Sequence, residues 1–379
     1  MTLHDDVAPL LTSLWNQGAP LYNPQNPYNA LCPETDGQLC VTGCVATALA
    51  QVLYYYRWPQ EPLTGPVPSY TMANDRVIDE LPATSFDWDN MVDDYTQPTT
   101  EEQQEAVARL MRYCGQTVQM DYTPYISNSY YYDTDILVNL FSYDQGLNFV
   151  YSTNYTIAEW NEMLYNELRE GRPMPYVGSS MGGGHAFVID GYQVKDGTGY
   201  YHVNWGWAGE ADGFYKINLF NPTSSGTGAS STSDGYNIQQ GALIGLQPAK
   251  APLTDYGRYL VSNEWNNVSI DENDIEHHIC GAVNTSYKPG LFTLALAERN
   301  ADGSIDYSQL YDQKDVEIAG FSAAEYPTIG TGKYNFEPLS QPSTLNSQPS
   351  TQDITTLQSS TRKAALQPPG GPYTALTAT

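Results

Sequence analysis

Two polar residues far apart in the chain, Cys44 and His185, have the residue types and the local context that nucleophilic catalysis requires. Cys44 follows a glycine and begins a run, residues 44–56, whose apolar residues recur at helical spacing. The amides and the dipole at a helix N-terminus favour the thiolate, which is the nucleophilic form of cysteine. Taken alone, such a cysteine also fits a small buried residue or half of a disulfide.

His185 follows three glycines, Gly182 to Gly184, and begins a strand-like run over residues 185–190. The glycines would let a substrate backbone approach the imidazole closely. A histidine beside an apolar strand is by itself more often a packed core residue than a catalyst. The separation of 141 positions from Cys44 to His185 falls within the roughly 130 to 150 positions typical of papain-type proteases. The pair is therefore far more specific than either member.

A third group follows at Asn204 and Trp205, at the end of another strand-like run. An amide or an indole at this place can orient an imidazole and shield its hydrogen bonds from water. Trp207 also fits a core aromatic residue, and we expect His202 to pack within its strand.

The predicted elements place these residues between two lobes. Helices are predicted over 44–56, 100–113 and 157–172, and strands over 185–190, 200–205 and 213–219. A helical first half followed by a β-rich second half predicts an α+β domain with its active site between the lobes. Residues 221–240, rich in Gly, Ser and Thr, predict a mobile loop that is a candidate lid.

The 379 residues divide by composition into three segments. Residues 1–250 contain every candidate for chemistry. Residues 251–337 alternate strand-like runs, such as 259–262 and 291–296, with turns, which predicts a small β-sandwich-like accessory module. Residues 338–379 are mostly Ser, Thr, Gln and Pro, and we predict that this tail is disordered.

Charge and cysteine count restrict the function classes. The chain has 43 acidic and 16 basic residues, a formal charge of −27, which repels phosphates and disfavours nucleic acid as a partner. The acidic residues are spread along the chain, so we infer no metal site. No apolar run approaches the ~18 residues of a membrane span, and residues 1–6 lack the pattern of an export signal. The odd number of cysteines, five, predicts at least one free thiol.

A family resemblance is carried by three long segments, Cys40 to Gln51, Gly183 to Gly191 and His202 to Trp207. They resemble the corresponding segments of streptopain-type enzymes, which are secreted bacterial cysteine peptidases with a papain-like fold. Shorter matches at residues 15–17, 86–90, 120–122 and 212–215 extend the resemblance over roughly residues 9–248. The resemblance implies a two-lobed papain-like cysteine endopeptidase that acts on proteins or peptides, at the cell surface or outside the cell.

The roles that this resemblance implies begin with a thiolate–imidazolium pair. Cys44 attacks the scissile carbonyl to form a thioester, and His185 first takes and then returns the proton. Gln17 and the Cys44 amide form the oxyanion hole. In the family the glutamine runs directly into Pro-Tyr-Asn, whereas here Gln17 is followed by Pro20-Leu-Tyr-Asn23. A second copy of this motif follows at Gln25 to Asn29, so Gln25 is the alternative.

Asn204 and the neighbouring Trp205 share the orienting role that the resemblance implies. Gly184 and Asn128 are expected to flank the substrate. No metal and no organic cofactor are needed.

Two other functions remain open at this point. A transglutaminase or an amidase would use the same Cys–His pair with another acyl acceptor or substrate. Alternatively, the chain is a surface-binding protein in which the module after residue 250 is the working part and the protease domain is a relic.

Overall fold

The computed structural model describes residues 3–129, 132–222 and 234–249, and beyond these only the backbone of strands between residues 260 and 377. The chain forms two compact units, Met1–Tyr256 and Gly257–Thr379. None of the helices within the described ranges is both long and apolar enough to cross a membrane.

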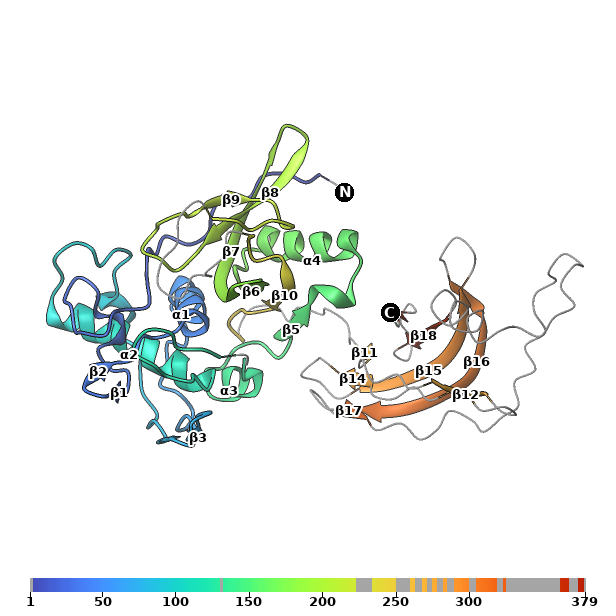
Figure 1. Ribbon diagram of the computed structural model, residues 1–379, viewed down its shortest axis with the longest axis horizontal. Coiled ribbons are helices and arrows are strands. Elements are labelled where there is room, and N and C mark those ends of the chain that lie inside the picture. Colours follow the sequence, from blue (N-terminus) through green and yellow to red (C-terminus); the bar gives the residue numbers. More distant parts are fainter. Residues whose placement is uncertain are drawn as a thin grey trace, which may run out of the picture. The chain divides into compact units, whose positions relative to one another are not determined.

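Three helices form the first lobe of the first unit: α1 (Cys44–Tyr56), α2 (Glu101–Thr117) and α3 (Thr134–Asn139) (Figure 1). The prediction of a helix over 44–56 is confirmed. Helix α2 continues four residues beyond the predicted end at residue 113, because its last turn is buried. Thr100 caps α2 through a reciprocal pair of hydrogen bonds with Gln103. Helix α3 was not predicted.

Short elements complete this lobe. They are η1 (Pro27–Asn29), β1 (Glu34–Thr35), β2 (Gln38–Leu39), β3 (Tyr70–Thr71), β4 (Val77–Ile78) and η2 (Trp88–Asn90).

The second lobe is a six-stranded antiparallel sheet in the order β5-β10-β6-β7-β8-β9. Its strands are β5 (Asn148–Tyr151), β6 (Met174–Ser180), β7 (Gly183–Lys195), β8 (Thr198–Asn204), β9 (Gly213–Tyr215) and β10 (Ile238–Ile244). The predicted strands 185–190 and 200–205 correspond to β7 and β8, and β9 ends four residues before the predicted 219. Strands β5, β6 and β10 were not predicted, and β10 begins at Ile238, inside the segment 221–240 that we expected to be a loop. Residues 223–233 of that segment lie outside the described residues.

Two helices pack on this sheet. Helix α1 lies against β7 and β6, which brings the first residue of α1 next to the strand that carries His185. Helix α4 (Ile157–Arg169), preceded by η3 (Ser152–Asn154), packs Trp160, Leu164 and Leu168 into a core with sheet residues that include Phe187. It ends three residues before the predicted 172.

The N-terminal arm links the two lobes. Val7 pairs with Tyr192 of β7 through two backbone hydrogen bonds of 2.8 and 2.9 Å. Further along, the Leu14 amide donates to the Asp93 carbonyl at 2.7 Å, and the Trp15 indole donates to the Val92 carbonyl at 2.8 Å. The arm therefore passes from the sheet to the helical lobe between residues 11 and 14.

Asp190 lies at a register shift between Ile189 and Gly191 and connects the N-terminal arm to the sheet through hydrogen bonds. Its carboxylate accepts a hydrogen bond from the Leu11 amide at 2.9 Å, and it lies 2.6 Å from Nδ1 of His202. His202, which we expected to pack within its strand, thus lies in β8 with a polar partner.

The described residues of the second unit are antiparallel strands, which form three sheets. The sheets are β11-β14-β17, β12-β13 and β16-β15-β18-β19. Their strands are β11 (Leu260–Ser262), β12 (Val268–Ile270), β13 (Ile275–His277), β14 (Ala282–Asn284), β15 (Gly290–Arg299), β16 (Ile305–Ile318), β17 (Ala323–Ala324), β18 (Arg362–Gln367) and β19 (Thr374–Thr377). The β-sandwich-like arrangement stays a prediction.

The 338–379 segment, predicted to be disordered, contains β18 and β19. Strand β18 pairs with β15 along Arg362–Gln367, where the sequence includes the apolar run Ala-Ala-Leu. The disorder of this segment stays a prediction. The rest of the segment lies outside the described residues.

Candidate active site

Cys44 is the first residue of α1, as predicted, and Gly43 is the residue that allows this placement. Gly43 has φ +84°, and a Cβ built there would lie 2.5 Å from Sδ of Met120 and 2.9 Å from the carbonyl oxygen of Ser127. A side chain at residue 43 would therefore be strained and would clash. The glycine lets the 120–128 segment close against the start of the helix beside the thiol.

Cys44 is partly exposed as a residue, and its thiol lies among backbone donors. Burial raises the pKa of the Cys44 thiol, while hydrogen bonding from the Ala186, Val45 and Cys44 amides opposes that rise. Val45 and Cys44 belong to the helix N-terminus, whose amides favour an anion. Ala186 belongs to β7 and directly follows His185. The Cys44 thiol therefore lies against the strand that carries the histidine.

His185 is buried, with 3% of its surface exposed, and its two ring nitrogens differ. Nε2 lies 2.9 Å from the carbonyl oxygen of Trp205. Because a carbonyl can only accept, Nε2 carries the hydrogen in the neutral ring. Nδ1 is buried, has no hydrogen-bond partner and is left with its lone pair. The ring is therefore held as a base whose accepting atom is Nδ1.

Aromatic side chains surround the imidazole. Trp207 stacks on it with ring centroids 4.8 Å apart, Trp205 is stacked at 6.1 Å, and Tyr236 is tilted at 5.5 Å. Burial lowers the pKa of His185 to about 4, and the Trp205 carbonyl opposes this shift. We expected a thiolate–imidazolium pair, but burial by itself favours the neutral forms of both Cys44 and His185.

Trp205 holds the imidazole with its backbone, and Asp212 in turn holds Trp205. The Trp205 amide donates to Oδ1 of Asp212 at 2.8 Å. Burial raises the pKa of Asp212 to about 6, and the hydrogen bond from Trp205 opposes the rise. Residue types alone did not indicate that the orienting atom would be a main-chain carbonyl.

Asn204 does not take the direct orienting role that we predicted for it. Its Oδ1 accepts from Nε2 of Gln51 at 3.0 Å and from the Gly206 amide at 3.0 Å, and its Nδ2 donates to the Ser13 carbonyl at 2.7 Å. The physical reason is the direction of its side chain, which forms hydrogen bonds with Gln51 of α1 and with Ser13 of the N-terminal arm. The imidazole is held by the next residue, Trp205.

Gln17 and its alternative Gln25 lie in different surroundings. Gln17 is 2% exposed, and its carbonyl accepts a hydrogen bond from the Thr42 amide at 2.9 Å, two residues before Cys44. Gln25 is exposed. The structure thus brings Gln17, and not Gln25, into the buried region next to the start of α1.

The two predicted substrate-binding residues lie on the surface beside this site. Gly184 is exposed, immediately before the buried His185, and pairs with Ser179 of β6. Asn128 is exposed and forms an isolated bridge with Asp121, and it follows the Ser127 carbonyl that packs over Gly43.

The other cysteines differ from Cys44 in burial. Cys32, Cys40 and Cys114 are free and buried, and burial raises the pKa of each thiol. Cys280 lies outside the described residues. Where side chains are described, three or more His, Cys, Asp or Glu never gather as a metal ion would require.

A partly exposed cysteine at a helix N-terminus in one lobe and a buried histidine on an antiparallel sheet in the other are the arrangement of papain-like cysteine proteases. Comparison with solved structures agrees. Active interpain A, a cysteine protease of Prevotella intermedia, matches with a TM-score of 0.53 and 36% sequence identity, over 64% of this chain and 95% of that chain.

Within this class, the chain belongs to the Peptidase C10 family, whose sequence profile matches residues 22–215. Streptopain of Streptococcus pyogenes is 33% identical over 259 residues, which cover 63% of each chain. Thiol protease/hemagglutinin PrtT of Porphyromonas gingivalis is 33% identical over 266 residues, which cover 65% of this chain and 28% of that protein. The matched part thus spans less than two thirds of these curated relatives. The predicted streptopain-type resemblance is confirmed.

Proposed function

We propose that this chain is a cysteine endopeptidase that hydrolyses peptide bonds in proteins, with Cys44 as nucleophile and His185 as general base. The observation that carries the proposal is the state of the imidazole. Nε2 is bound to the Trp205 carbonyl, which leaves the lone pair of Nδ1 in a buried site beside the strand residue that contacts the Cys44 thiol.

In the proposed reaction, the Cys44 proton moves to Nδ1 of His185 and the sulfur attacks the scissile carbonyl carbon. The resulting imidazolium returns this proton to the leaving amine as the C–N bond breaks and a thioester forms. A water molecule, deprotonated by His185, then attacks the thioester carbonyl carbon; the C–S bond breaks, the acid is released, and the Cys44 sulfur takes the proton back from His185. Burial opposes the charge separation of the first step, whereas the helix amides and the attraction between the two charges favour it.

The surrounding residues support two further roles. Gln17 and the Cys44 amide stabilise the oxyanion, because Gln17 is buried against the segment that leads into α1. The exposed Gly184 and Asn128 flank the substrate. A rise in KM for Asn128→Ala with little change in kcat would support this placement, and an unchanged KM would contradict it.

Hydrolysis of a denatured protein substrate by single variants tests the proposal. Cys44→Ala and His185→Ala should each lose at least about 10³-fold in kcat/KM, with the same far-UV circular dichroism as the parent. Cys114→Ala, which removes a buried thiol, is the matched control and should stay active. Turnover by a folded Cys44→Ala protein would overturn the proposal.

We assign the activity to the first unit, because every candidate residue lies before Tyr256. A chain that ends at Tyr256 should still cleave a small peptide, and loss of cleavage by a folded truncated chain would show that the second unit completes the site.

The proposed partners are proteins or peptides, and not nucleic acids. A secreted or surface location would be contradicted if the activity occurred only in the cell lysate of the source organism.

A further inference from the structure

Three buried polar side chains from distant parts of the chain, Ser13, Gln51 and Asn204, form a closed ring of hydrogen bonds. Ser13 Oγ donates to Oε1 of Gln51 at 2.9 Å, Gln51 Nε2 donates to Oδ1 of Asn204 at 3.0 Å, and Asn204 Nδ2 donates to the Ser13 carbonyl at 2.7 Å. Their exposed fractions are 2%, 0% and 3%. We call this ring the polar junction.

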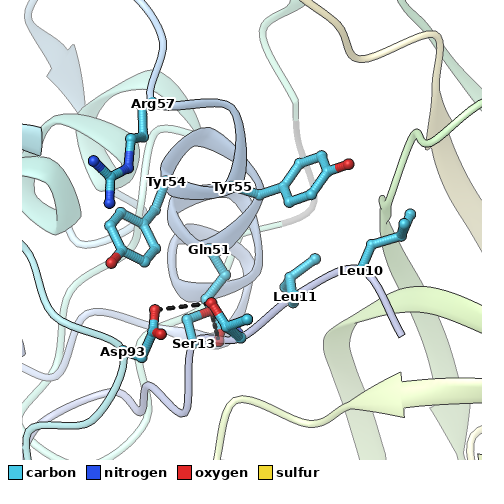
Figure 2. A pocket seen from close by; sticks show the side chains of 9 residues that line it. Leu10, Leu11, Ser13, Gln51, Tyr54, Tyr55, Arg57 and Asp93 are labelled. Carbon is cyan, nitrogen blue, oxygen red and sulfur yellow. Dashed lines mark hydrogen bonds between the residues drawn. The ribbon is translucent and has the colours of Figure 1, made fainter. Parts of the chain in front are cut away.

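The polar junction lies where the N-terminal arm passes between the lobes. Figure 2 shows Ser13 hydrogen-bonded to Gln51 on the wall of a pocket of about 250 Å³ that is also lined by Leu11, Tyr55 and Asp93. Ser13 and Gln51 line this pocket, and Asn204 does not. In the turn that follows Asn204, a Cβ at Gly206 would lie 3.3 Å from Cγ2 of Thr47, so this turn packs closely against α1.

Each member of the polar junction belongs to a segment that carries one part of the proposed catalytic machinery. Gln51 is on α1, two turns after Cys44. Asn204 directly precedes Trp205, whose carbonyl holds His185. Ser13 lies four positions before Gln17, whose own carbonyl is bound by the Thr42 amide. The segments that carry the proposed nucleophile, the support of the base and the proposed oxyanion donor are thus joined through the hydrogen bonds of the polar junction.

The hydrogen bonds of the polar junction also fix the orientation of the Gln51 side-chain amide. Gln51 accepts from Ser13 with one amide atom and donates to Asn204 with the other, so its amide can adopt one orientation only. A buried polar group without its partner is costly, which makes the satisfied arrangement strongly preferred. An apolar side chain of the same length could fill the space but could not set the distance between α1 and the Trp205 turn.

We propose that Gln51 is a positioning residue, which through Asn204 and Ser13 sets the separation of Cys44, His185 and Gln17. The inference rests on the proposed function for its kinetic consequences but not for its structural content. Small displacements of reacting groups have large kinetic effects, so loss of the donor to Asn204 should lower kcat by roughly 10- to 100-fold with little change in KM.

Three variants of graded severity test the inference. Gln51→Met keeps the length and removes both hydrogen bonds, Gln51→Glu keeps the acceptor for Ser13 and removes the donor to Asn204, and Ser13→Ala removes one hydroxyl only. In Gln51→Glu, protonation of the new carboxyl restores a donor, so its kcat relative to the parent should recover as pH falls from 8 to 5. A purely structural defect would show no such recovery.

The matched control is Gln116→Met. Gln116 is also buried and donates to the carbonyls of Pro68 and Asp79 at 2.7 and 3.1 Å, within the helical lobe. The Gln116→Met substitution should lower the melting temperature without changing the kcat of the protein that remains folded.

Alkylation of Cys44 by iodoacetamide separates this inference from the proposed function. The pH dependence of the rate should change in Gln51→Met and Gln51→Glu, and not in Gln116→Met, even if the parent hydrolyses no peptide. Parent-like kcat and parent-like alkylation in folded Gln51→Glu and Ser13→Ala proteins would overturn the inference. If Gln51→Met fails to fold, these two milder variants decide the matter.

Discussion

Nε2 of His185 lies 2.9 Å from the carbonyl oxygen of Trp205, a main-chain atom that can only accept a hydrogen bond. This relationship fixes the tautomer of the imidazole and leaves Nδ1 as the accepting nitrogen. The orientation does not depend on the chemistry of the side chain at residue 205. Substitution of Trp205 should therefore act through packing around the ring, since the carbonyl is common to all residues.

The pH below which activity is lost, here called the acid limit, should depend on Trp207. The indole of Trp207 stacks 4.8 Å from the imidazole of His185, and burial lowers the pKa of this histidine to about 4. A protonated His185 cannot accept the Cys44 proton, so kcat/KM should fall only as pH approaches about 4. Trp207→Ala admits water to the ring and should move this limit upward by roughly one unit.

The measurement is kcat/KM between pH 3.5 and pH 8 for the Trp207→Ala protein and its parent. Trp88→Ala is the control, because Trp88 is equally buried and donates to the Pro59 carbonyl in the helical lobe. An acid limit that stays in place in Trp207→Ala would show that this indole does not control the ionisation of the site.

Gln17→Ala should lower kcat by roughly 10² to 10³ with little change in KM, because a donor aimed at the developing oxyanion acts mainly in the transition state. Gln25→Ala is the matched control and should remain close to the parent, since Gln25 is exposed and Gln17 is buried. Steady-state kinetics on one peptide substrate suffices. Impairment of Gln25→Ala alone would transfer the role to the second copy of the motif.

Asp212→Asn should stabilise the protein more at high pH than at low pH. Burial raises the pKa of Asp212 to about 6 from the usual 3.8, with His202 and Asp190 as the nearby charges that lower and raise it. The folded state therefore binds this proton more tightly, and the contribution of Asp212 to the free energy of unfolding decreases as pH rises from about 4 to about 6. The asparagine keeps an acceptor for the Trp205 amide and does not ionise.

Melting temperatures of Asp212→Asn and its parent at pH 4.5 and pH 8 measure this difference. The variant should have a higher melting temperature than the parent at pH 8, and this difference in melting temperature should be smaller at pH 4.5. The contribution of His185 cancels because both proteins contain it. A difference that is independent of pH would show that Asp212 is not destabilised by its burial.

The parts of the fold that the sequence predicts well are those set by local pattern. Helix α1 follows from apolar spacing after Gly43, and β7 and β8 follow from β-branched and aromatic runs. Strand β6 contains Pro175 and Gly178, and β10 is inserted between β5 and β6, which adjoin it from much earlier in the chain. Such long-range pairing leaves no periodic signal.

The candidate site was predictable only in part. Residue type and spacing identify Cys44 and His185, but not which atom holds the imidazole, because a main-chain carbonyl has no residue type. The one available signal for the polar junction was Gln51, a polar residue inside a predicted helix. Its partners, Ser13 and Asn204, come from segments that only the folded chain brings together.

The most direct test of the account is covalent labelling by an epoxide-type inhibitor of cysteine proteases, with the modified residue mapped by mass spectrometry. Cys44 is the only partly exposed thiol among the four described cysteines, and Cys32, Cys40 and Cys114 are buried internal controls. The account predicts one label per chain, on Cys44, and much slower labelling in His185→Ala. A label on another cysteine of the folded protein, or labelling of Cys44 at an unchanged rate without His185, would contradict it.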